Sequence, residues 1–384
     1  MIAYNRQGLD VLWLKAAAQA WHERGLIAEE KWKALEGEHS VAFYSPNLFV
    51  RIGLAIFCFI LLLAGMGLMG LILSPNSTGA FALFCIFCGL GSLAVLEYWA
   101  IRSARHFGSG IDDMLLYVGV AAVITGLCAF LPYSVDTLAY CCMAAPFLIA
   151  GSIRYLDRLM GAGAFCCLLL MVLLTVNKIP GLALYLLPFS GMLFAAGAVF
   201  FARKGQGRYD WRHWHTVLVV VELLGLVTFY ASGNYWVVQQ FGEDLFSLAQ
   251  PPLGWFFWAC TFLVPALYIF WGIRGKERLL LDIGLVGVVA ALCTFRFYFH
   301  VLPLAWASTL GGAALFASAY FLIKYFQKNA TTYTYEADGN TSLLQTTGEH
   351  IVEQTTANQT APAPVRKESL GGGQFGGGGA EGGF

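Results

Sequence analysis

The sequence predicts an all-α fold, a polytopic transmembrane helix bundle of about ten spans with the N-terminus and the C-terminus in the cytoplasm. Apolar residues make up 58% of the chain and charged residues 12%, whereas a soluble domain carries roughly 25% charged residues. Long apolar runs recur from Val50 to Ile323, each near the roughly 20 residues that a helix needs to cross about 30 Å of hydrocarbon. These runs are continuously apolar and do not alternate, which favours helices over the strands of a membrane barrel.

The first part of the chain, 1–49, is predicted to form a cytoplasmic helical hairpin. Apolar residues recur at helical spacing after a cap at Asp10, and Gly25 separates this helix from a second one. The apolar residues of the two helices are Val11, Leu14, Ala18 and Trp21, then Trp32 and Leu35. No signal peptide is expected, because the apolar run begins only at Val50, after a charged segment. The hairpin either packs on itself and on the inner leaflet or binds a protein partner.

The opening of the chain also carries a resemblance. Trp21 is followed by Gly25-Leu26-Ile27-Ala28-Glu29-Glu30, within the run 14–73 that ends with a Gly-rich first span. This resembles an uncharacterised family of bacterial polytopic membrane proteins with a short N-terminal cytoplasmic helical hairpin. The resemblance implies a protein of the bacterial inner (cytoplasmic) membrane, and it implies no catalytic residue because that family has no assigned reaction.

The transmembrane domain, 50–325, contains ten apolar segments that we predict to be spans. They are 50–73, 80–101, 114–131, 137–152, 159–176, 182–201, 216–238, 253–273, 281–297 and 304–323. The fourth segment is short and contains Pro146, so the fourth and fifth segments either cross separately or form one re-entrant unit. A short helix lying in the outer interface is expected within 239–252.

The orientation follows from the basic residues. With the N-terminus inside, every Lys and Arg except Lys178 and Arg296 falls on the cytoplasmic side of this span map. A miscounted span would reverse the side of every later loop, so the alternation supports an even number of spans. The tryptophans of the membrane region also fall near predicted span ends, where indole rings are favoured.

The last part of the chain, 326–384, is predicted to be a disordered cytoplasmic tail. It is rich in Thr, Asn, Gln and Ala and then in Gly, and it cannot bury enough apolar surface to offset the entropy of ordering. Phe375 and Phe384 interrupt the Gly-rich end. The tail is either a solvated linker or a tether for a protein partner.

Ionisable residues inside the predicted spans are candidates for a polar site, since each is costly in hydrocarbon. Glu222 is the deepest acid, about two turns into its span, and is either a helix-to-helix hydrogen-bonding group or a proton or cation site. Glu97 lies about one turn from the inner end of the second span and is expected to reach toward Arg102 or Arg105. Arg296 lies near the outer end of the ninth span and is expected to reach the outer surface.

The sequence predicts no metal ion and no other cofactor. All ten cysteines lie within predicted spans, where we interpret them as small apolar side chains that pack between helices. Cys85 and Cys88 nevertheless have the spacing of a redox pair. His213 and His215 lack a third ligand and better fit an interfacial loop. There is no Gly-rich phosphate loop, no His-Glu-x-x-His and no Gly-x-Ser-x-Gly motif, so no catalytic residue is predicted.

Three classes of function remain open at this stage. A membrane scaffold or assembly protein, which binds a partner through the hairpin or the tail, explains the scarcity of buried polar groups. A secondary transporter or channel would use Glu222, but it predicts an internal symmetry that the sequence does not display. An intramembrane enzyme has no motif in its favour. The partners that we expect are the lipid bilayer and a protein bound through the hairpin or the tail, and we expect no nucleic-acid partner.

Overall fold

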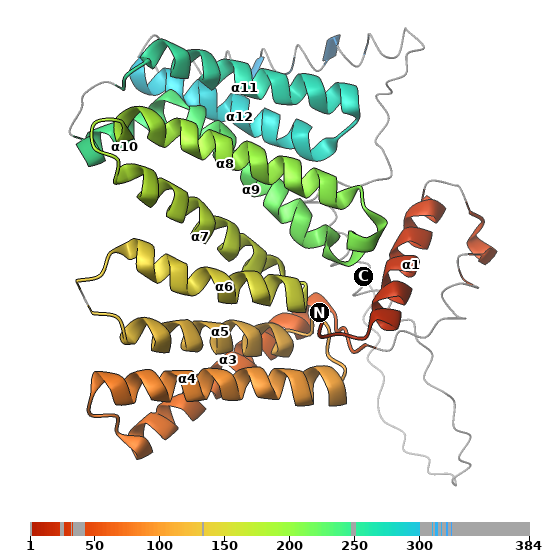
Figure 1. Cartoon of the computed structure of the whole chain (residues 1–384). Helices are drawn as coiled ribbons and strands as arrows, with labels where there is room; N and C mark the ends of the chain where they lie inside the picture. Colours follow the sequence, from red (N-terminus) through yellow and green to blue (C-terminus); the bar gives the residue numbers. More distant parts are fainter. Residues whose placement is uncertain are drawn as a thin grey trace, which may run out of the picture.

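The computed structural model is all-α. It describes residues 2–299 apart from 24–26, 32, 34–42, 133 and 247–250, together with isolated positions between 309 and 324. Its elements are α1 (Arg6–Glu23), α3 (Leu48–Leu73), α4 (Thr78–Val95), η1 (Leu96–Ser103), α5 (Ile111–Ala129), α6 (Thr137–Tyr155), α7 (Arg158–Asn177), α8 (Ala183–Gln206), η2 (Tyr209–Trp214), α9 (His215–Gly233), α10 (Tyr235–Phe246), α11 (Gly254–Gly275) and α12 (Arg278–Tyr298). Figure 1 shows the long helices side by side, with α1 apart from them at one end.

Within the described residues, nine helices are long and apolar enough to cross a membrane, which confirms the polytopic helix bundle. They agree with the first nine predicted spans to within a few residues at most ends. The segments 137–152 and 159–176 form two separate helices, α6 and α7, and not one re-entrant unit. The tenth predicted span and the second helix of the hairpin lie largely outside the described residues, and the predicted tail lies wholly outside them.

Side-chain caps explain where several spans begin. Asn47 accepts a hydrogen bond from the backbone N–H of Val50 at the start of α3, and Ser77 caps α4 in the same way. Asp157 caps α7 through the N–H of Met160 at 2.7 Å. Each cap satisfies a backbone donor that the first helical turn leaves free.

Two spans depart from the prediction. The second span was predicted as one regular helix, but its last eight residues form a π-helix, η1, which contains Glu97. The seventh span was predicted to continue to Val238, but α9 ends at Gly233 and the chain turns at Asn234 into the separate helix α10. The turn is fixed by Asn234, whose side-chain oxygen Oδ1 accepts a hydrogen bond from the backbone N–H of Trp236 at 3.0 Å.

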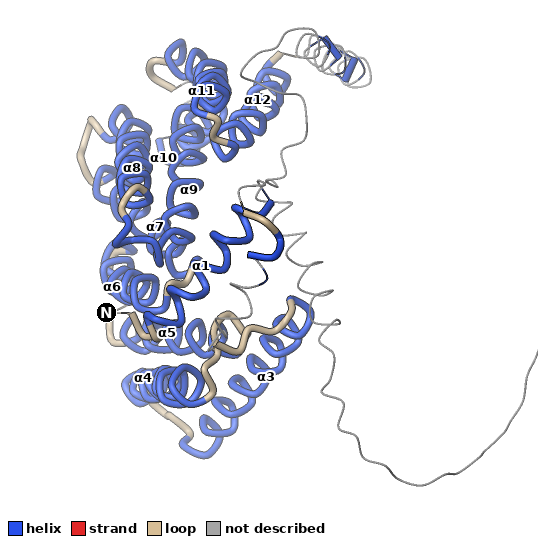
Figure 2. The backbone as a smooth tube through the Cα atoms, turned by 90° about the vertical axis from the view of Figure 1, so that its right-hand side faces the viewer, coloured by secondary structure: helices blue, strands red, loops and turns tan. Residues whose placement is uncertain are grey.

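The N-terminal helix was predicted to begin after a cap at Asp10, and this is wrong. Helix α1 starts at Arg6, and the side chain of Asn5 accepts a hydrogen bond from the N–H of Gln7 at 3.0 Å. Asp10 therefore lies inside the helix, where its carboxylate is directed to another element of the fold. Figure 2, which faces the end of the bundle where α1 lies, shows this helix in front of the spans.

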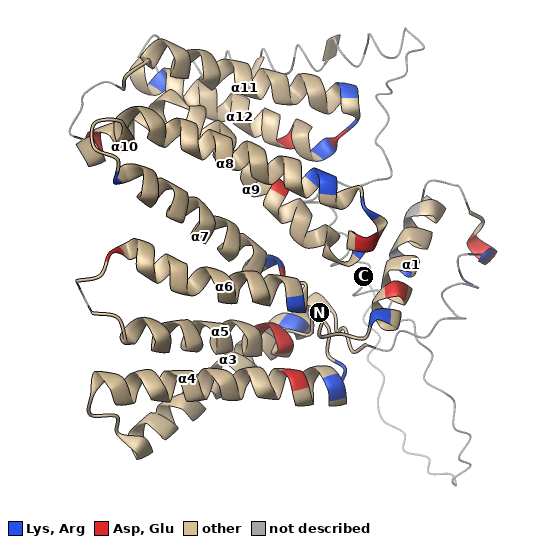
Figure 3. Ribbon diagram, in the orientation of Figure 1, with Lys and Arg blue, Asp and Glu red and all other residues tan. Residues whose placement is uncertain are grey.

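Lys and Arg residues of the described spans gather at the end of the bundle that carries α1, as Figure 3 shows. We call this end the basic end. It includes Arg51 at the start of α3 and Arg203 at the end of α8. Lys178, directly after α7, and Arg296, in the last turn of α12, lie at the end of the bundle opposite to the basic end, as the span map predicted.

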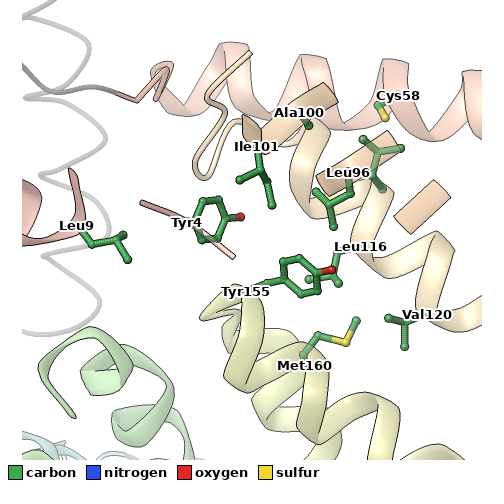
Figure 4. Packing of buried hydrophobic residues seen from close by; sticks show 11 residues of the cluster. Tyr4, Leu9, Cys58, Leu96, Ala100, Ile101, Leu116, Val120, Tyr155 and Met160 are labelled. Atoms are coloured by element: carbon green, nitrogen blue, oxygen red, sulfur yellow. The ribbon is translucent and has the colours of Figure 1, made fainter. Parts of the chain in front are cut away.

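Two clusters of buried apolar residues form the core. The first joins the N-terminal segment to α3, η1, α5, α6 and α7, and Figure 4 shows Tyr4 inserted among residues such as Ile101 and Tyr155. The second joins α9, α11 and α12 through residues such as Leu226 and Tyr268. We call the elements around these clusters the first and the second half of the bundle.

Glycine sets the close approach of α4 and α5. A Cβ atom built on Gly89 would lie only 2.7 Å from the carbonyl oxygen of Gly119 and 2.8 Å from the backbone nitrogen of Val123. The two backbones therefore touch where a side chain cannot fit, which is the small-residue packing expected of helices in a membrane.

Candidate functional site

Charged side chains at the basic end are used to join one element to another. Five ion pairs at this end each link two different elements of the fold. The pairs are Arg51 with Asp113, Arg154 with Glu97, Arg203 with Glu222, Arg203 with Glu277, and Arg212 with Asp10. Two of the three predicted site residues, Glu97 and Glu222, belong to this set, and they take part in different pairs.

Glu97 lies in the π-helix η1 and pairs with α6. Its Oε1 atom accepts hydrogen bonds from Arg154 Nε at 2.6 Å and from the hydroxyl of Tyr155 at 2.8 Å. The predicted partners were Arg102 and Arg105, and the ion pair is formed with Arg154 instead. Arg102 lies with its guanidinium 5.0 Å from the centre of the Tyr98 ring. A π-helix places Glu97 differently from a regular helix, and such segments recur at functional positions.

Glu222 is buried, and its carboxylate is held by α8. Oε1 accepts a hydrogen bond from Arg203 Nε, and Oε2 accepts one from Gln206 Nε2, both at 2.7 Å. The same guanidinium donates from its NH2 group to Glu277 at 2.7 Å, just before α12. Glu222 therefore lies at the level of the last turn of α8, near the basic end, and its two carboxylate oxygens both have partners.

Three further carboxylates at the basic end were not predicted as site residues. Asp112 is fully buried and accepts hydrogen bonds from the N–H groups of Gly108 and Ser109 at 2.7 and 2.8 Å. Asp113 accepts two hydrogen bonds from Arg51, at 2.5 and 3.2 Å. Asp157 accepts a hydrogen bond from the hydroxyl of Tyr117 at 2.8 Å, in addition to capping α7. The sequence feature that could have identified Asp112 and Asp113 is their position in the first turn of a helix, directly after the Gly-Ser-Gly loop 108–110.

The N-terminal segment is fixed to both halves of the bundle. In the first half, the N–H of Ala3 donates to the carbonyl of Arg154 at 2.9 Å, and the hydroxyl of Tyr4 donates to Asp112 at 3.5 Å. Burial and the charge of Asp112 raise the pKa of Tyr4 well above its ordinary value, so the hydroxyl stays protonated and remains a donor. In the second half, Asp10 accepts hydrogen bonds from Arg212 at 2.5 and 3.1 Å.

A cavity of about 430 Å³ lies between the N-terminal segment and the ends of the spans. One side is apolar and comes from α1, through Leu9, Leu12 and Trp13. The other side is charged. Its charged lining residues are Arg51, Asp112, Asp113, Asp157, Arg158 and Arg212. The three basic and three acidic residues balance in charge. The carboxylates are engaged in the hydrogen bonds described above, so these side chains serve to connect the ends of the helices.

The remaining predicted residues lie elsewhere. Arg296 is in the last turn of α12, at the end opposite to Glu97 and Glu222, so the structure does not bring the three together. At that same end, Asp136 pairs with Lys178 at 2.5 Å. All ten cysteines are free, and no group of three potential metal ligands occurs among the described residues. His213 contributes to α1 docking, with its Nε2 atom 3.2 Å from Asp10.

Comparison with known proteins finds no family model, no curated protein and no solved structure that matches this chain. The site is therefore interpreted from its own geometry. That geometry connects spans to each other and to α1, through buried or half-buried polar contacts at one end of the bundle.

Proposed function

We propose that this polytopic membrane protein is a scaffold of the bacterial inner membrane that binds a protein partner at its cytoplasmic face through α1. The observation that supports the proposal best is the docking of α1. The pair of Asp10 with Arg212 holds this helix at the basic end, while Trp21 remains exposed. Trp13 faces the cavity, with its ring 6.2 Å from that of Tyr209. An exposed indole ring on a fixed helix is typical of a binding surface, because Trp is enriched where interfaces are strongest.

The sidedness in this proposal rests on charge. Basic residues concentrate at the cytoplasmic side of bacterial membrane proteins, and α1 lies at the basic end. The bacterial assignment rests on the resemblance of the opening residues to a bacterial family.

The geometry of Glu222 supports the scaffold over the transport alternative. A transporter that uses Glu222 needs this carboxylate to border water near mid-depth, where it can exchange a proton or a cation. In the structure the carboxylate accepts hydrogen bonds from Arg203 and Gln206 and is buried. Such contacts are those of a group that holds two helices together.

A photo-crosslinking experiment in cells tests the scaffold. A photoreactive amino acid replaces Trp21, and a matched control carries it at Phe241, which is exposed on α10 at the other end. We expect a discrete adduct from α1 and none from the control. Asp10→Arg places two cations side by side and should reduce the adduct by loosening α1, and Asp10→Arg combined with Arg212→Asp should recover it.

Two results would contradict the proposal. One is the absence of any adduct specific to α1 in the native chain. The other is rapid labelling of Glu222→Cys by a membrane-impermeant maleimide, in a chain without the ten native cysteines. Rapid labelling would place Glu222 beside water and support transport.

A further inference from the structure

A second cavity, of about 710 Å³, lies on the flank of the bundle and is lined almost entirely by apolar groups. It is formed by α6 and α7 on one side and by α8, η2 and α9 on the other. Its volume is within the range of roughly 300 to 1,000 Å³ that is usual for sites that bind small molecules. We call it the lateral groove.

Small residues line the lateral groove. Gly161 and Ala164 of α7 lie along it, as do Gly197 and Ala198 of α8. Gly161 is closely packed, because a Cβ atom built on it would lie 2.8 Å from Cγ1 of Val217. A Cβ atom built on Gly197 would meet no atom within 4 Å, so the space beside this second glycine is open.

The groove runs at the depth of one lipid leaflet. In α7 it extends from Gly161, in the first turn of the helix, to Leu168. Seven residues of helix correspond to about 10 Å along the axis, compared with about 15 Å for one half of the hydrocarbon core. The groove therefore starts at the basic end and reaches toward the middle of the membrane.

Aromatic side chains mark the end of the groove at the membrane surface. Trp211 and Trp214 of η2 line it there, and Trp214 Nε1 donates to the carbonyl of Ile153 in α6 at 3.0 Å. This bond ties η2 across the groove. Indole rings prefer the headgroup level of a bilayer, so η2 lies where the polar part of a lipid would be.

Two cations lie near this end. The guanidinium of Arg208 is 5.9 Å from the centre of the ring of Trp211, which lines the groove. Lys204 follows the lining residue Phe201 by one turn of α8, and its ammonium is 5.9 Å from the neighbouring Phe200 ring. Among the described residues, neither cation forms an ion pair with a carboxylate. The other two basic residues of 203–212, Arg203 and Arg212, are engaged in ion pairs, which leaves Lys204 and Arg208 beside one acid, Asp210.

We propose that the lateral groove binds an acyl chain of one anionic glycerophospholipid from the leaflet at the basic end, with its phosphate held by Arg208 and Lys204. The apolar walls match the chain, and the unpaired cations match the phosphate. The groove would then be a specific lipid site, distinct from the general lipid contact around the bundle.

Filling the groove tests this proposal. Gly197→Leu places a side chain where a Cβ meets no atom within 4 Å, and Ala198→Leu is a second filling variant. Gly91→Leu is the matched control, because a Cβ at Gly91 also meets nothing within 4 Å and this residue lies on α4, away from the groove. The melting temperature of each purified variant shows that it is folded.

Binding is measured by native mass spectrometry of the full chain titrated with phosphatidylglycerol or phosphatidylcholine. We expect one phosphatidylglycerol to bind at least ten-fold more tightly than phosphatidylcholine, a ten-fold loss in both filling variants, and no change in Gly91→Leu. Replacement of Arg208 and Lys204 by Ala should remove the preference between the two lipids.

Any of three results would overturn the proposal. The first is wild-type affinity in both filling variants, and the second is equal binding of the two phospholipids to the native chain. The third is a change in oligomeric state on filling the groove, which would make this face an interface between copies of the chain.

Discussion

The pairing of Glu222 with α8 predicts that its charge stabilises the fold, and Glu222→Gln tests this without changing the size of the side chain. The amide still accepts a hydrogen bond from Arg203, and Gln206 can turn its own amide to accept from the new NH2 group. The change therefore removes mainly the charge opposite Arg203. A hydrogen bond to a charged group contributes about 1.5 to 3 kcal/mol, and Arg203 keeps Glu277 as a partner, so we expect a loss of about 1 to 2 kcal/mol.

Glu277→Gln is the matched control, because it removes the other carboxylate from the same guanidinium. The side chain of Glu277 is 48% exposed, whereas that of Glu222 is 8% exposed. An exposed ion pair contributes about 0 to 1 kcal/mol, so the control should lose about 0.5 kcal/mol or less. The assay is the midpoint of thermal unfolding in a mild detergent, where about 2 °C per kcal/mol is expected for a large chain. An unchanged midpoint in Glu222→Gln, or an equal drop in both variants, would refute the structural role of the Glu222 charge.

Three further predictions concern packing, pH and a buried amide. Gly89→Ala should lower the unfolding midpoint by the equivalent of about 1 to 3 kcal/mol, because its Cβ would meet the backbone of α5, whereas Gly91→Ala on the same helix has open space and should not lower it. Burial lowers the pKa of His106 from its ordinary value of 6.5, so the unfolded chain binds the proton more readily. The contribution of His106 to stability should therefore be full above about pH 6.5 and fall as the pH drops through and below that value. In His106→Leu the unfolding midpoint should depend less steeply on pH. A dependence as steep as that of the native chain would contradict this. Asn234→Leu should cost about 2 to 3 kcal/mol, since its buried amide bonds a hydroxyl group of each of two helices, and a midpoint within 1 °C of the native value would show those bonds to be dispensable.

The spans were predictable because lipid imposes a simple requirement on the sequence. Every crossing needs a long apolar run, and basic residues between runs fix the order of inside and outside loops. The ends of the runs were less predictable, because they depend on single side chains. Asn5 caps α1, which begins five residues before the start that was predicted from Asp10, and Asn234 ends α9 before the apolar run is complete.

The site was only partly predictable, because polar residues were ranked by depth along their own span. That ranking identified Glu97 and Glu222, but their partners depend on how helices meet in space. Arg154 is 57 residues from Glu97, so sequence proximity favoured Arg102 and Arg105. The same ranking passed over Asp113, because the third span was predicted to begin at residue 114 and this acid lay just outside it.

The arrangement of polar contacts also suggests why α1 is placed where it is. The ion pairs of Arg51 and Arg154 lie within the first half of the bundle, and those of Arg203 lie within the second. Each half is thus fixed by its own contacts. The N-terminal segment differs, because it bonds to Asp112 and to the carbonyl of Arg154 in one half and to Arg212 in the other.

Besides the packing of α7 against α8 and α9, polar contacts join the two halves at the basic end. Trp214 makes one such contact with α6, and α1 makes another through Asp10. The Asp10 pair is partly exposed and is worth about 1 kcal/mol or less, so it can be released at small cost. A protein bound to the exposed side of α1 would therefore act on a contact between the halves that is weak compared with the packing within each half.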